Sequence, residues 1–138
     1  MQSSGSSNRS LADKLGIKMG ENISIFHAPE NYDDLIGNWP VGVSVSRDVY
    51  DEMFSFIHYF ARGASELEHD LGKLVEHLLR DGSLWISWKK KSAARDSSFG
   101  ETEVRALGLA TGLVDVKVAA IDEEWSGLKF VRRSRDRI

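Results

Sequence analysis

The chain of 138 residues is long enough for one domain with a sizeable core and too short for two. Its formal net charge of −3 gives no general attraction to nucleic acid or acidic membranes, and the lack of cysteine excludes disulfides and cysteine-based metal or redox sites. No apolar run approaches the roughly 20 residues that a membrane-spanning helix needs. We therefore expect a cytoplasmic protein that uses neither a membrane nor specific nucleic-acid binding.

The two ends of the chain differ from its middle in composition. Residues 1–10 are rich in serine and lack an apolar signal core, so we expect a disordered leader there. Residues 129–138 carry a local charge of +4, and the last five of them, 134–138, are predicted to form a basic tail. Such a tail either binds an anionic partner or simply keeps the chain end solvated. Residues 11–133 are then predicted to form a single domain.

The first half of the chain predicts two short helices and three strands. Ser10 suits the N-cap of a helix at 11–15, which Gly16 would end. Pro29 suits the first turn of a second helix, which we expect to run to about Ile36. Strands are predicted at 22–27, 41–46 and 53–60, and the last is apolar on both faces, as a central strand should be.

The second half predicts two longer helices and three more strands. Ser65 and Glu68 are spaced as a capping box for a leucine-striped helix that Asp81-Gly82 would end. A weaker capping box at 98–101 predicts a helix that ends at Gly112. Strands are predicted at 83–88, 113–121 and 128–133, with a polar turn at 122–127 between the last two.

Helices and strands alternate through most of the chain. This pattern predicts a mostly parallel sheet with helices on both faces. Because only a tight turn joins the last two strands, they must be antiparallel. We therefore predict an α/β fold, a three-layer Rossmann-like sheet with a C-terminal antiparallel β-hairpin.

This hairpin, together with the helix-turn-strand unit at 78–86, resembles the class I methyltransferase version of the Rossmann fold. Over about residues 11–133 the chain also resembles a bacterial family, domain of unknown function 3052. The matching elements are 15–18, 28–30, 81–85, 112–115 and, above all, 125–131. The resemblance implies a reduced methyltransferase-like fold and a bacterial origin, and it transfers no catalytic residue.

Ligands of open α/β sheets bind outside the carboxyl ends of the strands. We expect this edge to gather eight candidate ligand-binding residues: His27, Pro29, Glu30, Arg62, Lys89, Lys90, Trp125 and Ser126. The lysines at 89–91 are either an anion site or a solvated loop, because consecutive side chains point in different directions. Trp125 either exposes its ring for stacking or folds back as a lid on the end of the sheet.

The loop after the first strand differs from that of a cofactor-binding methyltransferase. In that class a glycine-rich loop lets the backbone approach S-adenosylmethionine, whereas residues 27–32 contain no glycine. Glu30 would also repel the carboxylate of the cofactor. Asp48 and Asp51 both suit the acidic residue that closes the second strand and holds the ribose. We predict no cofactor and leave S-adenosylmethionine open as a disfavoured one.

The four histidines predict neither catalysis nor metal binding. His27 has no predicted partner to orient it as a base, and His58 lies within a buried strand. His69 and His77 are eight residues apart, whereas a helical metal pair needs a spacing of three or four. We expect no catalytic residue and no metal ligand.

Three functions remain open from the sequence. The leading hypothesis is a non-catalytic module that binds a small anionic ligand or a protein partner at the strand-carboxyl edge. The alternatives are a degenerate methyltransferase that still uses S-adenosylmethionine, and a domain that only contacts proteins through its basic tail. The sequence leaves enzymatic activity undecided, although it leans against it, and it does not predict an oligomeric state.

Overall fold

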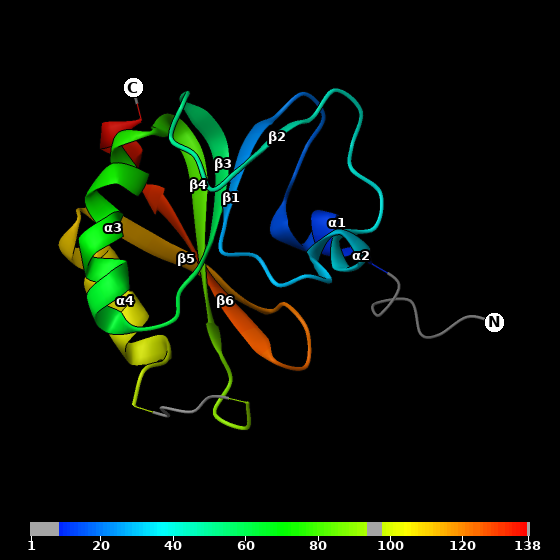
Figure 1. The fold of residues 1–138 in the computed structure, drawn as a ribbon. Helices are drawn as coiled ribbons and strands as arrows, with labels where there is room; N and C mark the ends of the chain where they lie inside the picture. Colours follow the sequence, from blue (N-terminus) through cyan, green and yellow to red (C-terminus); the bar gives the residue numbers. More distant parts are fainter. Residues whose placement is uncertain (1–8, 94–97, 138) are drawn as a thin grey trace.

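A computed structural model describes residues 9–93 and 98–137. The elements follow one another as α1 (Leu11–Leu15), β1 (Asn22–Phe26), α2 (Tyr32–Ile36), β2 (Ser44–Arg47), β3 (Phe54–Phe60), α3 (Ala64–Glu76), β4 (Leu78–Lys89), α4 (Glu101–Ala110), β5 (Leu113–Ala120), β6 (Trp125–Arg132) and the 3-10 helix η2 (Ser134–Asp136). Helices α3 and α4 cover one face of the sheet, and α1 and α2 lie on the other (Figure 1). The predicted three-layer arrangement is confirmed.

The six-stranded sheet has the order β2-β1-β3-β4-β6-β5. Strands β2, β1, β3 and β4 are parallel to one another, whereas β6 is antiparallel to both β4 and β5. The mostly parallel sheet and the antiparallel hairpin are therefore confirmed. Strands β1, β3 and β4 end at one edge, where β6 begins, and this edge carries the predicted site.

A separate apolar cluster forms the core on each face of the sheet. On one face, Leu67, Leu71 and Leu74 of α3 pack against strand residues such as Phe130. On the other, the short helices pack against a second cluster that includes Trp85, whose indole N–H donates to the Leu15 carbonyl at 3.0 Å. Burial of both faces fixes the register of every central strand.

The predicted start and end of α3 are both wrong. The helix has Gly63 as its N-cap, so Ser65 lies inside the first turn and forms no cap. The carboxylate at this turn comes from Glu66, which accepts a hydrogen bond from the backbone N–H of Arg62 at 3.3 Å. The leucine stripe continues past the helix because Leu78 is also buried, but it belongs to β4.

Other predicted boundaries also shift by a few residues. Strand β1 stops at Phe26, one residue early, because His27 has a positive φ of 59°. Residues 29–31 form a turn, so α2 begins at Tyr32 instead of Pro29. Helix α4 uses Gly100 as its N-cap, with Glu103 accepting from the Gly100 N–H at 2.7 Å, two residues after the predicted box.

Both ends of the described chain contact the domain. Arg9 pairs with Asp13, and Ser10 caps α1 by accepting from the Asp13 N–H, while residues 1–8 of the predicted leader lie outside the described residues. In the tail, Arg137 donates to the Arg132 carbonyl at 2.7 Å. Over the described residues, no helix has the length and apolarity needed to cross a membrane.

Candidate functional site

The predicted site residues lie around the edge where β1, β3 and β4 end. His27, Pro29 and Glu30 follow β1, and Arg62 comes two residues after β3. The remaining four candidates surround the junction of β4 with β6, where Lys89 is in register with Trp125 and Trp88 with Ser126; they are Lys89, Lys90, Trp125 and Ser126. The polar turn is shorter than predicted because residues 125–127 are already part of β6.

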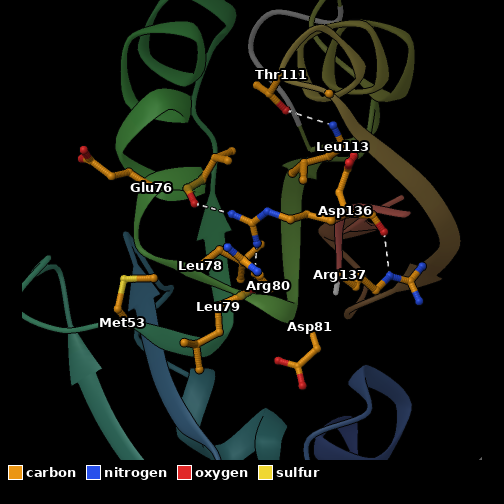
Figure 2. Close-up of a pocket in the computed structure, with 13 residues that line it drawn as sticks. Met53, Glu76, Leu78, Leu79, Arg80, Asp81, Thr111, Leu113, Asp136 and Arg137 are labelled. Carbon is orange, nitrogen blue, oxygen red and sulfur yellow. Dashed lines mark hydrogen bonds between the residues drawn. The ribbon is translucent and has the colours of Figure 1, made fainter. Parts of the chain in front are cut away.

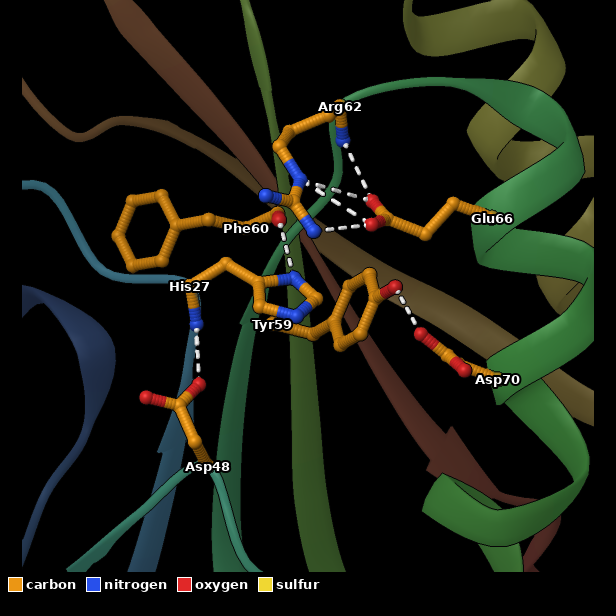
Figure 3. Close-up of polar contacts among 7 residues, drawn as sticks. All are labelled: His27, Asp48, Tyr59, Phe60, Arg62, Glu66 and Asp70. Carbon is orange, nitrogen blue, oxygen red and sulfur yellow. Dashed lines mark hydrogen bonds and ion pairs between the residues drawn. The ribbon is translucent and has the colours of Figure 1, made fainter.

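His27 and Asp48 form a strained, hydrogen-bonded pair at the ends of neighbouring strands. Among the described residues they are the two non-glycine residues with positive φ, at 59° and 58°. The Asp48 carboxylate accepts from the His27 N–H at 2.9 Å (Figure 3). The Asp48 N–H donates to the Ile25 carbonyl at 2.9 Å. Such backbone conformations cost on the order of 1 kcal/mol each and gather at functional sites.

The His27 imidazole is held in place by β3. Its Nδ1 atom lies 3.3 Å from the Phe60 carbonyl oxygen, and its ring packs edge-on against Tyr59 at 5.1 Å between centroids. The Tyr59 hydroxyl in turn donates to Asp70 of α3 at 2.5 Å. Burial raises the pKa of Tyr59 well above its usual range, and the hydrogen bond to Asp70 raises it further.

Arg62 and Glu66 form an ion pair one turn apart at the start of α3. The guanidinium and the backbone N–H of Arg62 both donate to the Glu66 carboxylate (Figure 3). These hydrogen bonds lower the pKa of Glu66 below its usual range, and the carboxylate raises the pKa of Arg62. Arg62 is therefore already paired, which weakens it as the main contact for an anionic ligand.

The two lysines of the site also have protein partners. Lys90 donates through Nζ to the Asp122 carbonyl at 2.7 Å, and its backbone N–H donates to the Glu124 carbonyl at 2.8 Å. Lys89 lies 3.9 Å from the Glu124 carboxylate and 5.7 Å from the centre of the Trp125 ring. These contacts tie the hairpin turn to the end of β4.

Trp125 is a lid on the end of the sheet and does not expose its ring. Its side chain is 7% exposed and packs perpendicular to Phe60 at 4.9 Å between centroids. The interpretation as an exposed stacking platform is therefore wrong. The Asp122 carboxylate accepts from the N–H groups of Glu124 and Trp125, which fixes the turn that carries the ring.

A second polar group lies in the middle of the sheet, out of contact with solvent. His58 lies between the Tyr32 hydroxyl, 2.9 Å from Nδ1, and the Ser87 hydroxyl, 2.7 Å from Nε2. Burial lowers the pKa of His58 to about 3, so the imidazole is neutral. The arrangement resembles a nucleophile and its base, but all three side chains are buried and satisfy one another. It confirms His58 as a core residue.

A cavity of about 850 Å³ lies at the opposite, amino-terminal edge of the strands (Figure 2). Its walls include Leu78 of β4 and Leu113 of β5, and none of the eight predicted site residues lines it. Three arginines and three acids balance its charge; they are Arg80, Arg132, Arg137, Glu76, Asp81 and Asp136. Arg132 is committed to the Leu79 and Val75 carbonyls, so this cavity offers no clear ligand chemistry.

Sequence reasoning missed Glu66 and Tyr59 and left Asp48 undecided. The capping-box pattern at 65–68 favoured Ser65 and Glu68 as the residues at the start of the helix, so Glu66 was not considered. Asp48 directly follows β2, and aspartate is one of the few residue types that tolerate positive φ, so a correct end for β2 would have selected it over Asp51. Tyr59 had no local signal because its contact with Asp70 depends on how α3 packs.

Known structures of similar fold include several methyltransferases. A SAM-dependent methyltransferase from Aquifex aeolicus is 14% identical with a TM-score of 0.62, over 87% of this chain and 86% of that one. Magnesium protoporphyrin IX methyltransferase (ChlM) from Synechocystis PCC 6803, with bound SAM, is 11% identical with a TM-score of 0.56, over 89% and 74%. Aeropyrum pernix fibrillarin, with natively bound S-adenosyl-L-methionine, is 13% identical with a TM-score of 0.55, over 88% and 73%.

The chain therefore has a class I methyltransferase-like Rossmann fold. No protein-family model and no curated protein sequence matches it. The predicted membership in the family of domain of unknown function 3052 is not confirmed. At these identities the similarity establishes the fold alone.

Proposed function

We propose that this protein is a non-catalytic module that binds a small ligand at the carboxyl edge of its sheet. The observation that carries the proposal is the strained pair of His27 and Asp48. These two residues have positive φ, are hydrogen-bonded to each other and lie at the edge where open α/β sheets bind ligands. This combination favours a binding role over a purely structural one.

The polar atoms around this pair indicate which chemical groups the ligand would carry. In the described structure, one oxygen of Asp48 and the Nε2 atom of His27 have no protein partner, so a hydroxyl or amine of the ligand would bind there. Lys89, at the end of β4 with a 3.9 Å contact to Glu124, would contact an anionic group of the same ligand, whereas the Lys90 amine already donates to the Asp122 carbonyl. Glu30 is exposed and Pro29 half-buried beside this edge, so a second negative charge next to β1 would be disfavoured.

A degenerate methyltransferase that uses S-adenosylmethionine is the second candidate. It is favoured by the position of Asp48, a carboxylate that directly follows β2, where a ribose could be held. Two of the structurally similar proteins have S-adenosylmethionine bound, which supports testing this ligand first. The glycine-free loop at 27–32 weighs against it, because Pro29 fixes φ where the backbone would have to approach the cofactor.

A thermal-shift panel tests both candidates. The panel contains S-adenosylmethionine, S-adenosylhomocysteine, adenosine, nucleotides and small carboxylates, and a compound that binds the native state stabilises it by RT ln(1 + [L]/Kd). We expect at least one compound to raise the melting temperature. In Asp48→Gly the shift should disappear, and glycine preserves the backbone because it adopts positive φ without penalty.

Asp51→Gly is the matched control, since it removes an exposed carboxylate from the same loop. It should retain the shift. The binding proposal would fail if no compound shifted the wild type, or if Asp48→Gly responded as strongly as the wild type. A shift with adenosine and the two methyl-cycle compounds, but not with simple carboxylates, would favour the second candidate.

We also propose that the chain belongs to the bacterial family of domain of unknown function 3052 and that it acts in the cytoplasm. The support is the segment 125–131, which is the most specific part of the resemblance and forms most of β6. Sequences that share this segment should also have an acidic residue directly after β2. If sequences with the segment lack that acidic residue, the proposed site would not be a feature of the family.

A further inference from the structure

Two lysines face each other across the last two strands of the sheet. Lys117 of β5 is in direct register with Lys129 of β6. Like charges directly opposite in an antiparallel pair are destabilising. This juxtaposition is therefore unfavourable unless an opposite charge compensates it.

Both ammonium groups lie at the carboxyl end of α1. Lys117 donates through Nζ to the Lys14 carbonyl at 3.1 Å. The Nζ atom of Lys129 lies 3.6 Å from the point where a Cβ atom on Gly16 would stand, which places this ammonium group beside Gly16, the residue that ends α1. These contacts bring two cations to one place on the face of the sheet that carries α1.

A third lysine adds to the charge, and a single carboxylate opposes it. Burial lowers the pKa of Lys129, and the nearby charges of Lys117 and Lys18 lower it further, while Glu21 acts in the opposite direction. The Glu21 carboxylate already accepts from the Lys18 backbone N–H at 3.0 Å. In the described part of the chain, Lys129 has no hydrogen-bond acceptor or ion-pair partner for its half-buried amine.

We propose that Lys117 and Lys129 bind the phosphate group of a small molecule. A phosphate oxygen would give Lys129 the acceptor that it lacks, and charge-assisted hydrogen bonds of this kind are among the strongest in proteins. The doubly charged group matches the two positive charges of the lysine pair, whereas a carboxylate would leave the pair half neutralised. The site is on the β5–β6 half of the sheet and is separate from the strained pair after β1 and β2.

Thermal unfolding in inorganic phosphate tests the proposal. Melting temperatures are compared in sodium phosphate and in sodium chloride of equal ionic strength at neutral pH, with pyrophosphate as a second probe. We expect phosphate to raise the melting temperature of the wild type. In Lys129→Gln the melting temperature in chloride should rise, because the like-charge contact is gone, and the phosphate-dependent increase should disappear.

Lys73→Gln is the control, because it removes the same charge from α3 on the opposite face of the sheet. It should keep the full response to phosphate. Lys117→Gln is the second variant and should also lose the response, so a folding defect in Lys129→Gln would leave the proposal testable. An unchanged response in both cluster variants, or no response of the wild type at millimolar phosphate, would overturn it.

Discussion

The centre of the sheet and its carboxyl edge differ in the burial and hydrogen bonding of their polar side chains. At the centre, His58 is buried and each of its ring nitrogens has a hydroxyl partner from Tyr32 or Ser87. At the edge, His27 and Asp48 stay partly or largely exposed, hold positive φ and leave polar atoms open to a ligand. Both regions contain a histidine next to hydroxyl or carboxyl groups, yet they differ in strain and access.

This difference predicts which residues matter for stability and which for the proposed binding. A buried network that is completely satisfied stabilises one arrangement of the strands, and losing any member leaves an unpaired polar group. An exposed pair in a strained conformation contributes little to stability, so changes there should affect binding far more than folding. Each of the following measurements can break or sharpen that distinction.

The largest effect is expected at the centre. Replacing His58 with leucine removes the partner of the Tyr32 and Ser87 hydroxyls, and each unpaired buried group costs about 1–3 kcal/mol. Chemical denaturation should show a loss of this size, and Tyr32→Phe in the same background should recover part of it. A variant as stable as the wild type would show that the network does not hold the strands together.

Acid should destabilise the protein through the same residue. The pKa of His58 is lowered to about 3 in the native state from 6.5, so between these values the unfolded chain binds a proton that the native state does not. Stability contributed by the neutral imidazole is therefore complete above about pH 6.5 and is lost as the pH falls, by about 1.4 kcal/mol per pH unit. Denaturation curves between pH 7 and 4 should show this slope. His58→Leu should remove it, whereas replacing the exposed His69 with glutamine should not.

Asp48→Gly should change the stability by less than about 1 kcal/mol. The relief of positive φ and the loss of the hydrogen bond from the His27 N–H act in opposite directions and have similar size. Urea denaturation would measure the difference. A loss of several kcal/mol would show that this pair is structural and would count against its proposed role in binding.

The smallest effect is expected from Arg62→Gln. The ion pair with Glu66 is largely exposed, and such pairs contribute about 0–1 kcal/mol. The unfolding free energy should therefore change by less than that amount, and added salt should reduce the difference further. A larger loss of unfolding free energy would indicate that the pair stabilises the start of α3, and that it is structural in the same way as the His58 network.

The alternation of helices with strands was enough to predict the fold class. Periodicity and turn residues are local, so the strand at 53–60 and the hairpin after Gly112 could be read directly from the sequence. The error in α3 has a physical reason too. Leu78 continues the spacing of the leucine stripe, and a buried residue looks the same in the pattern whether it lies on a helix or on a strand.

The candidate site was predictable as an edge but not as a set of contacts. The parallel strands identify where His27, Arg62 and Lys89 gather, because a ligand edge follows from strand direction. Whether a lysine at this edge is free depends on its neighbours, and Lys90 turned out to be committed to the Asp122 carbonyl. Trp125 is buried because Phe60, from a distant part of the sequence, offers a face for its ring.

By itself, the sequence determined the three-layer sheet, its closing hairpin, the core position of His58 and the edge of the sheet at which the candidate residues gather. These depend on local patterns of apolar and turn residues. The tertiary structure alone decided the pairing of His27 with Asp48, 21 positions along the chain, and the register that sets Lys117 against Lys129. Such contacts depend on how strands are aligned, which burial on both faces of the sheet controls and no local pattern records.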